Sequence, residues 1–207
     1  MTDYPVQLDV TSPAHFARVQ LLLRIAFAIV AGWLGVTGGW VACVLFAVLP
    51  LVAAIAMSSY GREKYLTDSA PKIWSVLNWL IELSAFMLLL TDRFPVRHEE
   101  DALHSEIRFT GKPTIGSALI RLLTSIPSAI VLFFISIVSG FVWLIGAFLI
   151  LVGAPMPHWV TAYQLGVLRW QARLIAYHAS LVEEYPPFAL DTETGSRAGG
   201  TLAAHAP

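Results

Sequence analysis

The sequence predicts an all-α integral membrane protein of two tandem repeats, each with a short strand, a two-helix transmembrane hairpin and an amphipathic interface helix. Three observations predict this fold class. Of 207 residues, 57% are hydrophobic and 13% charged, the balance of a membrane protein. Long uncharged runs alternate with short charged segments, and the two parts of the chain resemble each other at nearly constant spacing.

Composition also excludes some classes of protein and partner. The formal net charge of −1 provides no surplus of Lys and Arg for nucleic acid, so we expect no nucleic-acid partner. The single cysteine, Cys43, permits no intrachain disulfide and is predicted to be a small buried hydrophobe. The polar first residues lack the basic start and cleavage site of a signal peptide, so we expect the first apolar helix to stay in the bilayer.

The first repeat, residues 1–96, opens with a predicted strand, because residues 4–10 alternate apolar and polar side chains. Residues 19–36 are almost wholly apolar and are long enough to cross a hydrocarbon core of ~30 Å at about 1.5 Å per residue. A short Gly-containing turn leads to a second apolar run, residues 40–57. So short a turn predicts an antiparallel transmembrane hairpin.

Residues 73–91 form a third predicted helix, which either spans the membrane or lies in its interface. Lys72, Asn78 and Glu82 interrupt its first half. A membrane-spanning placement would move the basic residues of segment 93–112 to the opposite side, so we favour the interface.

Residues 97–106 are predicted to be a solvated acidic linker. Six of its side chains are potential metal ligands, but their spacing matches no zinc motif, and we expect no metal. They are His98, Glu99, Glu100, Asp101, His104 and Glu106.

The second repeat, residues 107–189, restarts the pattern with a predicted strand at 107–111. Apolar spans at 117–138 and 141–152 follow, separated by a predicted break at Ser139-Gly140. The strand and the first span repeat at a shift of 101 residues, whereas the final Trp-containing helix repeats at a shift of 91. The last residues, 190–207, have no apolar periodicity and are predicted to be a disordered tail.

Basic residues near membrane spans are retained on the cytoplasmic side, which predicts the orientation of the spans. The two predicted hairpin tips, near Gly38 and Gly140, carry no basic residue. Four spans and two interface helices then place both termini and the linker in the cytoplasm. The basic residues that this arrangement puts on one side are Arg18, Arg62, Lys64, Lys72, Arg93, Arg97, Arg108, Lys112, Arg169 and Arg173.

The Trp-containing helix of the second repeat has an aromatic and aliphatic stripe, with Arg169 and Arg173 on another face. This pattern is typical of a helix lying in the membrane surface, with arginines toward phosphates. An alternative of similar weight is that the stripe packs on the hairpins and the arginines are solvated. The residues predicted to contact lipid headgroups or a partner are Arg169, Arg173, Trp170, Tyr177 and Trp79.

Glu82 is a predicted carboxylate at membrane depth and needs a positively charged neighbour. The repeat alignment sets Glu82 on Arg173, and corresponding positions approach each other if the repeats pack about a twofold axis. A Glu82–Arg173 pair is therefore one hypothesis, and Arg24 in the first span is an equally available partner.

No catalytic constellation is recognisable: the sequence has no G-x-S-x-G, no phosphate-binding glycine loop and no Cys-x-x-Cys. His178 could carry a proton or ligate a cofactor, but a surface or interface histidine is the favoured interpretation. We therefore expect no enzymatic activity and no cofactor.

The end of the chain resembles a family of bacterial membrane proteins known only as a domain of unknown function, family 4389. The matching features are a strand, a two-span hairpin, G-V-x-R-W, an Ala-Tyr pair and Y-P-P-F; the first copy matches more loosely, with Asn78 and Val96 replacing an Arg and a Pro. The resemblance implies two tandem copies but no activity. The matching residues are Gly166, Val167, Arg169, Trp170, Ala176, Tyr177, Tyr185, Pro186, Pro187 and Phe188.

These features favour a non-enzymatic scaffold or accessory subunit of a larger membrane complex, with membrane lipids and another membrane protein as partners. The alternative is a lipid-handling or small-solute transport protein with a site between the repeats. Transport predicts a polar cavity around Glu82, Arg24 and Arg173, whereas a scaffold predicts dry packing there.

Overall fold

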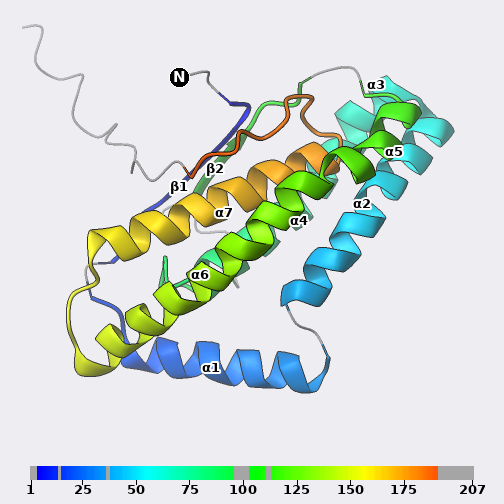
Figure 1. Ribbon diagram of the computed structural model, residues 1–207. Coiled ribbons are helices and arrows are strands. Elements are labelled where there is room, and N and C mark those ends of the chain that lie inside the picture. Colours follow the sequence, from blue (N-terminus) through cyan, green and yellow to red (C-terminus); the bar gives the residue numbers. More distant parts are fainter. Residues whose placement is uncertain (1–3, 14, 36–37, 96–102, 111–112, 191–207) are drawn as a thin grey trace, which may run out of the picture.

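A computed structural model describes residues 4–13, 15–35, 38–95, 103–110 and 113–190, and the described chain is mostly helical (Figure 1). The predicted tail beyond residue 190 lies outside this part. The elements are β1 (Val6–Val10), α1 (Arg18–Trp33), α2 (Gly38–Tyr60), α3 (Arg62–Lys64), a π-helical turn η1 (Tyr65–Ser69), α4 (Ala70–Met87), β2 (Leu103–Ile107), α5 (Ile115–Thr124), α6 (Ile126–Val152) and α7 (His158–His178).

The two strands form one antiparallel sheet. The predicted first strand is confirmed by β1, but the second prediction was wrong by four residues, because β2 occupies 103–107 and not 107–111. The predicted linker, residues 97–106, therefore includes most of β2. The charged residues of this segment suggested a solvated linker, but Leu103 is buried against the core and holds the segment to the fold. Leu8 pairs with Ser105, 97 residues later, and Val6 pairs with Ile107. The strands are therefore related by a local twofold rotation.

Two helices, α2 and α6, are long and apolar enough to cross a membrane. The predicted span at 19–36 is the shorter helix α1, with 16 residues. The predicted span at 117–138 was wrong, because it covers the 10-residue helix α5 and the first half of α6, and the predicted span at 141–152 is the second half of α6. The predicted break at Ser139-Gly140 was wrong, because α6 runs through it without interruption. Ser and Gly weaken a helix by at most about 1 kcal/mol each, and Ser139 is held by two hydrogen bonds to Gln164 of α7.

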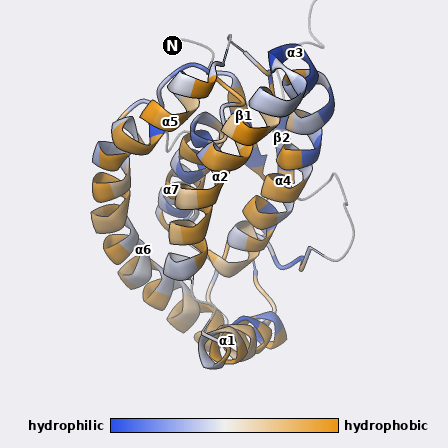
Figure 2. Ribbon diagram, turned by 90° about the vertical axis from the view of Figure 1, so that its right-hand side faces the viewer, coloured by the Kyte–Doolittle hydropathy of each residue, from blue (hydrophilic) through white to orange (hydrophobic). Residues whose placement is uncertain are grey.

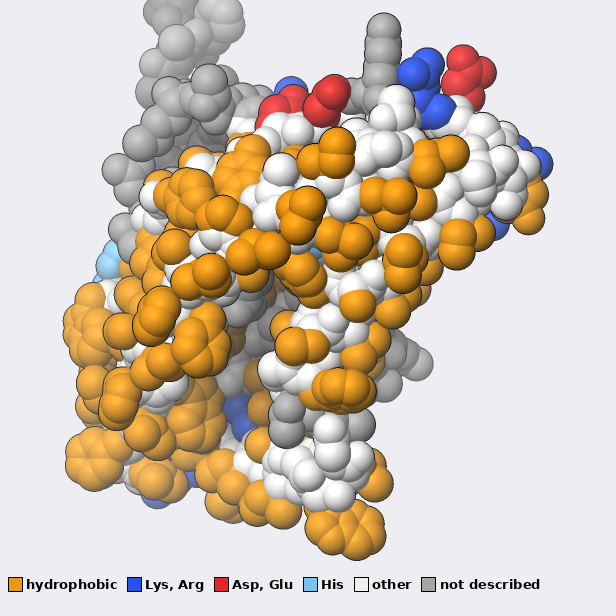
Figure 3. Space-filling model, turned by 45° about the vertical axis from the view of Figure 1, so that its right-hand side comes forward, with side chains coloured by type: hydrophobic (Ala, Val, Ile, Leu, Met, Phe, Trp, Pro, Cys, Tyr) orange, Lys and Arg blue, Asp and Glu red, His pale blue; other side chains and the backbone are white. Residues whose placement is uncertain are grey.

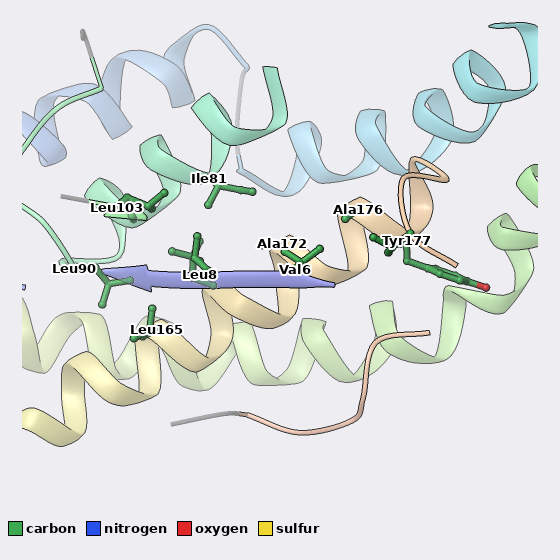
Figure 4. Close-up of a cluster of buried hydrophobic side chains, with 12 residues drawn as sticks. Val6, Leu8, Ile81, Leu90, Leu103, Leu165, Ala172, Ala176 and Tyr177 are labelled. Atoms are coloured by element: carbon green, nitrogen blue, oxygen red, sulfur yellow. The ribbon is translucent and has the colours of Figure 1, made fainter. Parts of the chain in front are cut away.

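The predicted interface helix of the second repeat is the buried centre of the fold. Fourteen of the 21 residues of α7 are buried. The sheet and α4 pack against α7, and α6 packs beside it (Figures 1 and 2). Figure 4 shows the apolar cluster between these elements, with Leu8 and Ile81 from the first half of the chain and Leu165 and Ala172 from the second.

Large apolar side chains cover the outer faces of α1, α2 and α6. On the face in Figure 3 they spread over most of the surface, whereas the acidic side chains lie along its upper edge with some of the basic ones. Cys43 lies on the exposed first part of α2, so its predicted burial was wrong. Apolar surface of this extent is typical of contact with lipid or with another protein.

Candidate functional site

Helices α4 and α7 end in the same way. Two residues after each helix lies a non-glycine residue in left-handed conformation, Leu89 after α4 and Ser180 after α7, each with φ of 60°. The closing backbone hydrogen bonds also correspond, as Leu90 N donates to Ala85 O and Leu181 N to Ala176 O. Residues other than glycine rarely adopt this conformation. Its occurrence at two positions 91 residues apart therefore indicates that the ends of α4 and α7 are equivalent.

A buried arginine holds the end of α4. Arg24 of α1 donates from Nε to Phe86 O (2.6 Å) and from Nη2 to Thr91 O, and its side chain is fully buried. Its guanidinium lies 4.3 Å from the centre of the Phe86 ring and forms an ion pair with Asp92 (3.1 Å). Phe86 O, which also accepts from Leu89 N in the closing turn, and Thr91 O beyond the helix thus acquire a charged donor.

Arg121 of α5 holds the end of α7 in the same manner. Its Nη1 donates to Tyr177 O and to Val182 O (2.6 Å), and its guanidinium lies 4.4 Å from the Tyr177 ring centre. Tyr177 and Val182 follow Phe86 and Thr91 by 91 residues. Arg121 follows Arg24 by 97 residues, the same shift that relates the strands.

Sequence reasoning missed Arg121, although a signal was present. Leu22-Leu23-Arg24 and Leu119-Ile120-Arg121 match at a shift of 97 residues. The shift of 101 that was used displaces the alignment by four residues, about one helical turn, and therefore sets Arg24 on Ser125.

A second polar contact joins three helices at the end of α7. Ser125 Oγ lies 2.9 Å from His178 Nδ1, and His178 Nε2 bonds to Phe46 O of α2. Because a carbonyl only accepts, Nε2 carries the proton and Nδ1 accepts from Ser125. Of the two settings expected for His178, surface or interface, burial excludes the surface, because His178 is 2% exposed and makes its hydrogen bonds between helices. Burial lowers the pKa of His178, the hydrogen bond to Phe46 O partly offsets this, and the guanidinium of Arg121 lowers the pKa further.

Three residues predicted to face lipid headgroups lie inside the fold instead: Arg169, Trp170 and Tyr177. Arg169 donates from Nε to Leu8 O (2.8 Å) and pairs with Asp9, so it binds the outer edge of β1. An unpaired strand edge needs hydrogen-bond partners, and this explains why an arginine is retained within the core.

The remaining predicted site residues are Trp79, Arg173 and Glu82. Trp79 is 40% exposed and donates to Pro95 O (3.0 Å). Arg173 lies over the ring of Tyr4 (5.2 Å), and Glu82 accepts from Asn78 (2.8 Å). The Glu82–Arg173 pair stays a prediction, as do headgroup contacts of Trp79 and Arg173.

The alternative Arg24–Glu82 pair was wrong. The carboxylate that pairs with Arg24 is Asp92, which follows the end of α4 and also accepts from Ala17 N (2.7 Å). Of the possible metal ligands in the linker, residues 98–101 lie outside the described residues, and His104 and Glu106 belong to β2.

The described chain is thus a mostly helical protein with a small sheet and two helices of membrane-spanning length. The model of a family described as Domain of unknown function (DUF4389) matches residues 116–189, which supports the resemblance for the second half. The match covers one copy and not the two that were expected. No curated protein and no solved structure matched the chain.

Proposed function

We propose that this protein is a non-enzymatic scaffold or accessory subunit of the bacterial inner membrane, built from two quasi-equivalent repeats. The observation that carries the proposal is the apolar packing between the halves. The cluster around Leu8, Ile81, Leu103 and Leu168 fills the junction of the sheet with α4 and α7 (Figure 4). A dry junction is what a scaffold requires.

The helix ends support the duplication. Arg24 and Arg121 bind equivalent carbonyls, the left-handed residues Leu89 and Ser180 are equivalent, and the strands pair with twofold symmetry. Each half has two apolar helices after its strand, α1 and α2 in the first and α5 and α6 in the second, but the lengths differ, because α1 has 16 residues and α5 has 10.

The alternative of transport is less well supported. Its site required Arg24 to be available in a polar cavity, but Arg24 is bound to the end of α4 and to Asp92. The exposed apolar faces, in contrast, favour a membrane partner.

Purification tests the scaffold proposal. We expect the full chain, extracted in gentle detergent, to copurify with a membrane protein in fixed ratio. Phe141 and Phe148 of α6 are 64% and 62% exposed. Replacing both by Ala should abolish binding of this partner without unfolding the chain. Phe188→Ala, 57% exposed and outside α6, is the matched control. Recovery of the wild-type chain alone, or solute flux in liposomes containing it, would contradict the proposal.

Fusion reporters test the proposed orientation. Tyr4 Oη donates to Glu184 O (2.8 Å) and Thr110 Oγ1 to the Glu184 carboxylate (2.6 Å), which supports placing the N-terminal strand, the linker and the end of α7 on one side. The basic residues favour the cytoplasm. Fluorescent-protein fusions after Glu100 and after Leu190 should therefore both be active, and alkaline phosphatase activity at either site would refute this topology.

A further inference from the structure

Helix α2 contains a proline in its interior that leaves one backbone acceptor without a helical donor. Pro50 has no N–H, so it cannot bond the carbonyl of Phe46 four residues earlier. His178 at the end of α7 donates from Nε2 to this carbonyl. Its ring also stacks on Phe46, with centres 4.2 Å apart and planes 23° apart. His178 at the end of α7 thus provides the hydrogen-bond donor that Pro50 cannot provide.

Pro50 also separates two parts of α2 that pack differently. Residues 38–48 contain no buried residue among them, whereas Leu49, Pro50, Ala53, Ala54 and Met57 are buried. Prolines are the commonest sites of helix bending. The contact between Phe46 and His178 therefore anchors the first part of α2 next to the natural bending point.

We propose that Pro50 is a hinge in α2 and that neutral His178 is the latch that keeps it closed, so that acid pH releases the first part of α2 from the end of α7. Burial beside a fixed cation makes the latch sensitive to protons. On protonation Nδ1 would donate to Ser125 Oγ and Nε2 would still donate to Phe46 O, but the closed state would then hold a second positive charge next to Arg121 at a side chain that is 2% exposed.

The charges around His178 oppose its protonation in the closed state. The cation beside it is Arg121 of α5, which is itself fixed on Tyr177 O and Val182 O. The other titratable side chains nearby are the phenols of Tyr65, which is bonded to Ala179 O, and of Tyr177. On α2 the nearest titratable group is the exposed thiol of Cys43, one turn before Phe46.

The sign of the pH dependence follows from these contacts. Burial lowers the pKa of His178 in the closed state, whereas an opened, hydrated His178 regains an ordinary value of about 6.5. Between these two pKa values the ratio of open to closed molecules rises about tenfold for each unit by which the pH falls. At higher pH both states are neutral and the ratio is constant.

Distance measurements between two spin labels test the latch in the full chain, reconstituted in lipid nanodiscs. The native Cys43 is exposed and precedes the hinge, and Leu144→Cys on α6 provides the second label at a side chain that is 58% exposed. Between about pH 8 and pH 5 we expect a longer distance to gain population by about tenfold per unit within the titration range.

Two variants make the test specific. His178→Gln retains an N–H donor for Phe46 O but does not titrate, so its distances should not change with pH. Pro50→Ala returns a backbone donor to Phe46 O and should stay closed in acid; because alanine favours helix, this variant remains informative if the other does not fold. Equal distances at both pH values in the wild type, or an undiminished response in either variant, would overturn the proposal.

Discussion

Replacing Arg24 by Met should lower the free energy of unfolding by about 3–5 kcal/mol, because it removes a fully buried donor but leaves its acceptors in place. Phe86 O and Thr91 O would lose charged hydrogen bonds, and Asp92 its ion-pair partner. Methionine fills a similar volume, so the loss reports on hydrogen bonding and charge rather than on a cavity. Denaturant titration of the purified protein in detergent measures the change.

The two halves provide an internal comparison. Arg121→Met should have a similar cost, since it removes the charged donor of Tyr177 O and Val182 O. Arg62→Met on the exposed start of α3 is the control and should stay within about 0.5 kcal/mol of wild type. The loss of unfolding free energy for Arg24→Lys should lie between the losses for Arg24→Met and Arg62→Met, because one ammonium group does not reproduce the rigid guanidinium fork. If Arg24→Met were as stable as Arg62→Met, the arginines would not fasten the helix ends.

The sequence predicted those parts of the fold that depend on local pattern. Alternation located β1, and uninterrupted apolar runs located α2 and most of α6. The correspondence of α4 with α7 at a shift of 91 residues also agrees with their matching ends. These features are visible in sequence because the period of a helix or strand is imposed residue by residue.

Tertiary contacts determined what the sequence did not predict. Nothing near Ser139 indicates that Gln164 bonds to it and so supports an unbroken α6. The helix that contains Arg169 was predicted to be amphipathic with Arg169 on its polar face. The sequence does not reveal the partner of Arg169, because the edge of β1 lies about 160 residues earlier in the chain. The same holds for His178, whose acceptor becomes free only through a proline in another helix. A hydrophobicity pattern identifies which face is apolar, but not whether protein or lipid covers it.

Replacing Leu168 by Ala should be the most damaging substitution of an apolar side chain at the junction of the halves, with a loss of about 2–5 kcal/mol in the free energy of unfolding. Leu168 is 1% exposed and lies in the cluster that joins the sheet, α4 and α7. Leu144→Ala makes the same chemical change on the outer face of α6, where the side chain is 58% exposed, and should cost no more than about 0.5 kcal/mol. Denaturant titration of both variants in one detergent compares them directly. Equal losses would mean that the junction is not tightly packed, and this would restore the case for a transport site between the repeats.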